Sequence, residues 1–135
     1  MDQRYFTADE ANQALEEVRP LTEELVAYRR ALVDLQERQS ALTTRIAGNG
    51  GNVEPHELQN VQEELDEQLA GIARCVARIH EVGGLVKDLD DGLVDFPAKR
   101  HGEDVLLCWR LGEDEVAHWH GLEEGFAGRK QLDPE

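Results

Sequence analysis

Aromatic residues and cysteines are scarce in this chain of 135 residues. Aromatic side chains make up 5% of the sequence and charged side chains 32%, a balance that suits elongated helices better than a compact globule. The two cysteines, Cys75 and Cys108, lie far apart, and neither belongs to a Cys-x-x-Cys pair. This spacing excludes a zinc ribbon and a dithiol redox motif, and it favours a cytoplasmic protein with reduced thiols.

Basic segments and long apolar runs are also missing. The 14 basic residues face 29 acidic ones, which gives a net charge of -15, and no third of the chain is basic. A nucleic-acid-binding protein needs a basic surface for phosphates, and an anionic membrane surface would repel this chain. No apolar run reaches the length of a signal peptide or a membrane span. The sequence therefore predicts a cytoplasmic protein that binds neither nucleic acid nor membrane.

Helical periodicity, by contrast, fills the first two thirds of the chain. Thr7 to Glu10 has the pattern of a capping box, and apolar residues then recur at alternating steps of three and four, as in a coiled coil. Pro20 lies inside this segment and is expected to bend the helix or split off its first part. A second series starts near Pro55 and continues to Leu89. The two series are Val18, Leu21, Leu25, Tyr28, Leu32, Leu35, Leu42 and Ile46, and Leu58, Val61, Leu65, Gln68, Ile72, Cys75, Ile79, Val82, Val86 and Leu89.

The two series match each other in antiparallel order. Facing positions have a nearly constant sum of residue numbers, from Ile46 with Leu58 at one end to Val18 with Val86 at the other. This agreement predicts a long antiparallel helical hairpin over residues 1–92, with a loop of glycine and asparagine at 47–54. Residues 93–135 are then expected to form a separate small module, packed on the hairpin or on a partner chain.

A second apolar stripe runs along the expected hairpin. It consists of Val26 and Val33 on the first helix and Leu69 and Val76 on the second. A thin hairpin buries little area for its length, so this face needs a cover. We expect a homodimer through these four residues, with the C-terminal module as the alternative cover.

Three short apolar segments follow the helices, and we expect each to be a strand. Pro97 lies in the first, which indicates an edge strand. The expected fold class is therefore mainly helical with a small β appendage: a coiled-coil-like hairpin followed by a three-stranded antiparallel meander. The segments are 93–100, 105–111 and 116–120.

The turns of this meander leave the strand register open. A turn at His101–Gly102 places Asp95 opposite Cys108, whereas a turn at Gly102–Glu103 places Asp95 opposite Arg110. The length of the link between the second and third expected strands is also open. A two-residue link puts His118 and His120 on the face of Trp109, and a three-residue link puts them with Cys108 and Arg110.

Two strings in this region are distinctive, Gly92-Leu93-Val94-Asp95-Phe96-Pro97 and Leu107-Cys108-Trp109-Arg110-Leu111-Gly112-Glu113. With Phe6-Thr7, Lys87-Asp88, Trp119-His120 and Gly125 to Arg129, they make the chain resemble the bacterial domain-of-unknown-function 2203 family over almost its whole length. The resemblance implies a small uncharacterised protein with a helical part and a short strand module, and it implies no known activity.

The polar residues of the module allow three interpretations. They could form a buried network that orients the strands, with His120 as a hydrogen-bonded core residue. They could form a ligand site, in which two arginines bind an anion beside a tryptophan. They could also hold a metal ion through two histidines and a cysteine or Glu113. The candidate ligand-binding residues are Asp95, Arg110, Glu113, His120, Arg129 and Trp109, with Trp119 as another wall, and the candidate metal ligands are Cys108, His118 and His120.

No spacing supports a hydrolase with a nucleophile and a base, and Cys108 lies among Leu and Trp residues, where a thiol is unreactive. The leading prediction is a non-enzymatic interaction or scaffold protein that acts as a homodimer. The alternative is a protein that binds a small anionic ligand or a metal, which could include an enzyme, at the cluster of Asp95, Arg110, Glu113 and His120. A metal is the one cofactor that these residues suggest.

Overall fold

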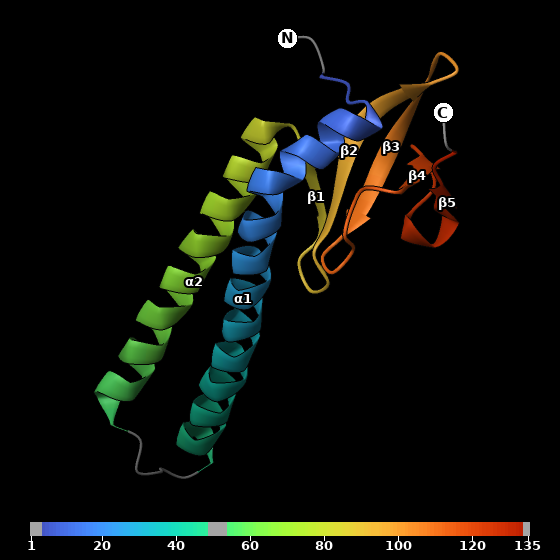
Figure 1. Ribbon diagram of the computed structural model, residues 1–135. Coiled ribbons are helices and arrows are strands. Elements are labelled where there is room, and N and C mark those ends of the chain that lie inside the picture. Colours follow the sequence, from blue (N-terminus) through green and yellow to red (C-terminus); the bar gives the residue numbers. More distant parts are fainter. Residues whose placement is uncertain (1–3, 49–53, 134–135) are drawn as a thin grey trace.

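The computed structural model describes residues 4–48 and 54–133 and consists of a helical hairpin joined to an antiparallel sheet (Figure 1). The predicted loop at 47–54 falls largely on residues 49–53, outside the described part of the chain. Within the described ranges, no helix has an apolar stretch long enough to span a membrane. The elements are α1 Ala8–Ala47, α2 Pro55–Val82, β1 Leu85–Asp88, β2 Leu93–Arg100, β3 Glu103–Arg110, β4 His118–Gly121, the 3-10 helix η1 Phe126–Gly128 and β5 Lys130–Gln131.

Helix α1 begins at the predicted capping box. The Thr7 side chain accepts a hydrogen bond from the Glu10 amide, and the Glu10 carboxylate accepts one from the Thr7 amide. The helix continues through Pro20 to Ala47, although this proline cannot donate the usual backbone hydrogen bond. Figure 1 shows the first turns of α1 inclined to the rest of the helix. Pro20 thus lies in a bent helix that is not split.

Helix α2 ends earlier than the apolar series suggested. Gly83 has a φ of 113°, the left-handed conformation of a helix C-cap, and its amide bonds back to the carbonyls of Ile79 and His80. The prediction that the helix reaches Leu89 is wrong. Val86 belongs to strand β1, where its side chain still packs on the same core. Its apolar character therefore fitted both the helical and the extended interpretation.

The sheet has five strands in the order β1-β2-β3-β4-β5, and the prediction of three is corrected. Strand β1 pairs with Leu93–Asp95, so β2 is not an edge strand along its whole length. Pro97 lies beyond the residues that pair with β1, although it is still opposite Leu106 of β3. Its carbonyl accepts a hydrogen bond from the Phe6 amide. The missing amide of proline is tolerated there. Strand β5 is only two residues long, and the sequence pattern gave no sign of it.

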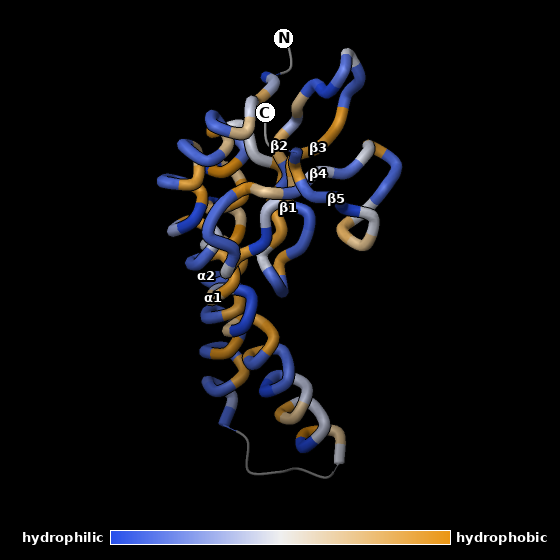
Figure 2. Tube along the Cα trace, turned by 45° about the vertical axis from the view of Figure 1, so that its right-hand side comes forward, coloured by the Kyte–Doolittle hydropathy of each residue, from blue (hydrophilic) through white to orange (hydrophobic). Residues whose placement is uncertain are grey.

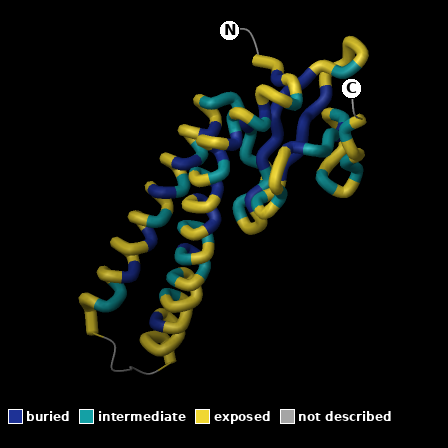
Figure 3. Tube along the Cα trace, in the orientation of Figure 1, coloured by how far each residue is buried: buried dark blue, intermediate teal, exposed yellow. Residues whose placement is uncertain are grey.

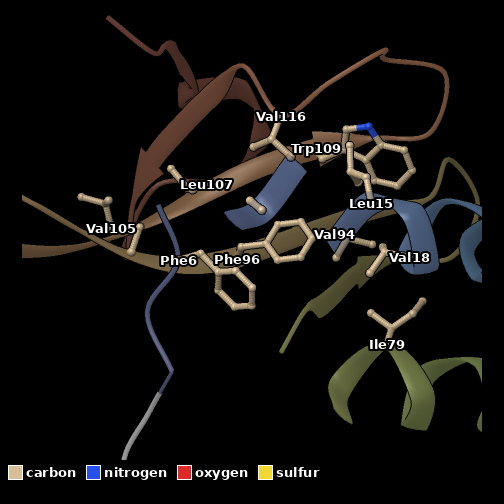
Figure 4. Packing of buried hydrophobic residues seen from close by; sticks show 12 residues of the cluster. Phe6, Leu15, Val18, Ile79, Val94, Phe96, Val105, Leu107, Trp109 and Val116 are labelled. Atoms are coloured by element: carbon tan, nitrogen blue, oxygen red, sulfur yellow. The ribbon is translucent and has the colours of Figure 1, made fainter. Parts of the chain in front are cut away.

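The main core lies where the start of α1 and the end of α2 meet one face of the sheet. Val94, Phe96 and Trp109 point at the helices and are 0% exposed (Figure 4). Truncating Phe96 or Trp109 to alanine would lower the free energy of unfolding by about 3–5 kcal/mol. Figure 3 shows buried residues concentrated here, and Figure 2 shows apolar residues recurring along both helices. The helical side of this core consists of Ala11, Leu15, Val18 and Ile79.

The far half of the hairpin has a smaller core of its own. Its buried residues are Leu32, Leu42, Val61 and Leu65, with Leu35, Leu58 and Ile72 packed around them.

The second apolar stripe is divided by the sheet. The β1–β2 turn packs on α1, where a Cβ at Gly92 would lie 3.1 Å from Val26, and Val26 is 4% exposed. Val33 and Val76 are partly buried, whereas Leu69 is 50% exposed. The chain thus covers Val26 itself and leaves Leu69 open to solvent.

Candidate functional site

The strand registers bring three buried side chains together on the sheet face that points away from the helices. The β2–β3 turn is His101–Gly102, both with positive φ, so Asp95 lies opposite Cys108. Strand β4 places His118 opposite Cys108 and His120 opposite Leu106. Side chains alternate between the faces of a sheet, so Asp95, Cys108 and His120 all project from the face opposite Phe96 and Trp109. The first turn is thus one of the two considered, His101–Gly102, whereas the second link, residues 111–117, is longer than either length considered and still places His118 and His120 on the face of Cys108.

The three side chains are close enough to share one ion. One donor atom each from Asp95, Cys108 and His120 lies within 4.8 Å of the other two. The carboxylate Oδ2 of Asp95 is 3.0 Å from Nε2 of His120. The three residues are only 2%, 1% and 4% exposed, so they are shielded from water.

The backbone fixes the tautomer of His120. Its Nδ1 is 2.8 Å from the carbonyl oxygen of Gly121, which can only accept a hydrogen bond, so Nδ1 carries a proton. In the neutral ring, Nε2 then presents a lone pair to the Asp95 carboxylate. A positive charge is needed between these two acceptors, either a proton or a metal ion. A histidine whose second nitrogen donates to a backbone carbonyl is the usual arrangement of a metal ligand.

Burial governs the ionisation of the other two groups. It raises the pKa of Asp95, an effect opposed in part by His120 and by the hydrogen bond with Cys108. Burial, and next the charge of Asp95, raise the pKa of the Cys108 thiol to about 12. Without a bound cation, Cys108 is therefore a neutral thiol at pH 7, as expected from its apolar surroundings.

A bidentate ion pair lies beside the cluster. Arg129 donates from its two terminal nitrogens to the two carboxylate oxygens of Glu113, at 3.0 and 2.7 Å. Burial of Glu113 would raise its pKa, but the bonds from Arg129 and from the Arg110 amide outweigh burial, so the pKa is lowered. The bonds to Glu113 raise the pKa of Arg129, and the nearby Cys108 side chain adds a smaller effect. The ion pair thus connects the η1 segment to the cluster.

His118 lies at the margin of the cluster. Its Nδ1 is 3.8 Å from Oε2 of Glu113 and is buried without a hydrogen-bond partner among the described residues. A buried nitrogen of this kind normally has a partner. The structure therefore places His118 next to Cys108 with one unused lone pair or donor, although its atoms are not part of the three-residue cluster.

Two of the candidate ligand residues lie elsewhere. Trp109 is in the main core on the opposite face, where its indole donates to the Glu113 carbonyl at 3.0 Å. Arg110 is exposed, and its guanidinium lies 5.8 Å from the centre of the Phe126 ring. Trp119 also belongs to the face of the main core. The structure thus brings Asp95 and His120 together and places the Glu113–Arg129 pair beside them, whereas Trp109 is on the other face. The Arg110 side chain is exposed but lies over the same Phe126 ring as Arg129, and its amide donates to Glu113.

The sequence grouped Asp95 with His120 and gave Cys108 as one of two possible partners of Asp95, but it gave no sign of the Gly121 carbonyl as the partner of His120. The sequence signal that favoured Asp95 opposite Cys108 was the His101–Gly102 pair, because a two-residue turn with glycine in second place fixes this register. The backbone contact of His120 leaves no trace in the sequence.

The fold and the cluster together define a class of protein: a two-helix hairpin on a five-stranded antiparallel sheet with a buried Asp–Cys–His group. Comparison with family models places residues 4–132 in the family described as "Uncharacterized conserved protein (DUF2203)". The chain belongs to this domain-of-unknown-function 2203 family, as its sequence strings indicated. No curated protein and no solved structure shows a significant match to the chain.

Proposed function

We propose that this chain is a metal-binding protein whose ion is held by Asp95, Cys108 and His120. The observation that carries the proposal is the pair of facing acceptors, Nε2 of His120 and Oδ2 of Asp95, 3.0 Å apart with the Cys108 sulfur beside them. A cation between these atoms satisfies all three at once. A proton satisfies only two and leaves a protonated thiol in contact with the pair.

The donor set favours zinc. One nitrogen, one oxygen and one sulfur suit a borderline-soft divalent ion, and zinc is the common occupant of such mixed sites. The carboxylate of Asp95 and the thiolate of Cys108 together neutralise a divalent charge, so the occupied site is electrically balanced inside the protein. Three protein ligands leave a fourth position, and His118 is the nearest unused donor.

The direct test is the metal content of untagged protein. One zinc or similar ion per chain should be found by elemental analysis, and Cys108→Ser should lose it. Cys75→Ser is the matched control, because Cys75 is the other buried cysteine and lies in the hairpin. Metal-free protein that also fails to take up zinc, cobalt or iron would refute the proposal, and so would equal loss of metal in both variants.

The exposed part of the second apolar stripe favours a second candidate, an interaction or scaffold protein that acts as a homodimer. Leu69 is 50% exposed and lies midway along α2. Light scattering should then report twice the chain mass of 15.2 kDa, and Leu69→Lys should halve it. A monomer at micromolar concentration would exclude this candidate. We also propose a cytoplasmic location, supported by the two free cysteines.

A further inference from the structure

A cavity of about 770 Å³ opens on the other face of the sheet, between the start of α1 and the tip of the β2–β3 hairpin. Its apolar lining comes from strands β2, β3 and β4 and from the segments just before α1 and just after β5, and its size is within the range of small-molecule sites. In Figure 1 the chain ends, the first turn of α1 and the tip of the hairpin all lie at this end of the molecule. The apolar lining includes Phe6, Ala98, Val105, Leu107, Trp119 and Leu132.

Cations stacked on aromatic rings form the rim. The guanidinium of Arg100 lies 4.7 Å and the ammonium of Lys130 4.8 Å from the centre of the Trp119 ring. Lys99 lies 4.8 Å from the centre of the Tyr5 ring. A cationic ligand would stack on these ring faces, where Arg100, Lys130 and Lys99 already lie and would repel it. Lys99 and Arg100 line the cavity and Lys130 lies beside it, and each is paired with a carboxylate, of Asp104, Asp133 and Glu124 respectively.

The counter-ion of Arg100 is weakly held. Arg100 pairs with Asp133, whose side chain is 76% exposed while that of Arg100 is 24% exposed. An exposed carboxylate contributes little to such a pair, so an incoming anion can replace it at low cost. Lys99 is paired with Asp104 in the same manner at the edge of the cavity.

From these contacts we infer that the cavity binds a small organic anion with a flat apolar body, its ring among the apolar lining residues beside Trp119 and its carboxylate or phosphate on Arg100. A planar guanidinium suits either anionic group, because it can donate two parallel hydrogen bonds. The site is separate from the Asp95 cluster, which projects from the opposite face, so it stands or falls independently of the metal.

The test uses 2-naphthoate, with 2-naphthamide as a neutral probe of the same shape and 2-naphthylmethylammonium as a cationic one. Calorimetry should show naphthoate binding at least about tenfold more tightly than the amide, the value of one charge-assisted hydrogen bond. In nitrogen-edited NMR spectra the Trp119 indole signal should shift, and the Trp109 indole signal, from the main core, should not.

Three variants locate the anion. Arg100→Gln should remove the preference for naphthoate, whereas Asp133→Asn should tighten naphthoate binding several-fold. Asp133→Asn changes an exposed side chain and therefore tests the inference even if the arginine variant fails to fold. Arg38→Gln, on the exposed surface of the hairpin, is the control and should change nothing. Equal binding of the amide, tighter binding of the ammonium probe, or no binding of naphthoate would overturn the inference.

Discussion

Zinc binding at Asp95, Cys108 and His120 should release one proton from the Cys108 thiol at neutral pH. The metal-free protein holds a thiol whose pKa is about 12, raised by burial and then by the Asp95 charge, whereas zinc takes the thiolate. The proton must leave when the ion binds. The thiol proton alone should therefore make the apparent affinity rise about tenfold for each unit of pH below the thiol pKa, and displacement of the proton shared by Asp95 and His120 should steepen this rise.

The size of the proton cost sets the expected affinity. At pH 7, removing a proton from a group with a pKa of about 12 costs about 7 kcal/mol, against about 2 kcal/mol for an ordinary thiol. The difference is about 5 kcal/mol. Structural zinc sites bind with about 10–16 kcal/mol at this pH, so about 5–11 kcal/mol remains here. This corresponds to a dissociation constant between about 10 nM and 0.1 mM.

The assay is a zinc titration of metal-free protein against a chromophoric chelator at several values between about pH 6.5 and 8.5. Calorimetry in two buffers with different ionisation enthalpies should count two released protons, one from the Cys108 thiol and the one shared by Asp95 and His120. In Cys108→Ser the affinity should fall and the number of released protons should drop by one, whereas Cys75→Ser should match the wild type. Cys75 is a fair control because burial raises its thiol pKa too. An affinity independent of pH, or unchanged in Cys108→Ser, would refute the reasoning.

Three further predictions concern folding, and chemical denaturation measures each. Gly83→Ala should cost about 2–3 kcal/mol, because φ is 113° and the new Cβ would lie 2.6 Å from the Phe6 ring. Gly102→Ala, at a φ of 80° with no described atom within 4 Å, should cost only the backbone strain, and equal losses would contradict this. The pKa of Glu113 is lower in the folded protein than the value of about 4.3 in the unfolded chain, so its ionised form stabilises the fold above that value. This stabilisation is lost as pH falls through the pKa of the folded protein. The stability difference between wild type and Glu113→Gln should thus shrink on acidification, and a constant difference would exclude it. Asp95→Asn should fold with unchanged or higher stability without metal, because the amide can donate to Nε2 of His120, yet bind zinc weakly; a large loss of stability would instead indicate an essential ion pair.

The helical part of the fold could be predicted because its signals are local. The capping box at Thr7 and the alternating apolar steps each depend on residues a few positions apart. The end of α2 could not be placed, since Val86 and Leu89 continue the helical phase beyond Gly83. Only the left-handed backbone of Gly83, packed against Phe6 from the other end of the chain, ends the helix there. Periodicity alone carries no information on such a long-range contact.

The candidate site depended on the strand register, which the sequence left open. Glycine at Gly102 is compatible with both two-residue turns, and a shift of one residue would have placed Asp95 opposite Arg110. The link from β3 to β4 spans residues 111–117, longer than either link considered, yet it puts His118 and His120 on the face of Cys108. Trp109 could not be assigned to the opposite face before the register was known.

The two separate cores of the hairpin have a consequence for its dynamics. The near end of α1 and α2 shares its buried residues with the sheet, whereas the far end depends on Leu32, Leu42, Val61 and Leu65 alone. Regions with few buried apolar contacts open at a lower free energy than the whole molecule. The far half of the hairpin should therefore unfold and refold as a cooperative unit while the sheet stays intact. A partner that orders this unit would stabilise the protein without contacting the Asp95 cluster.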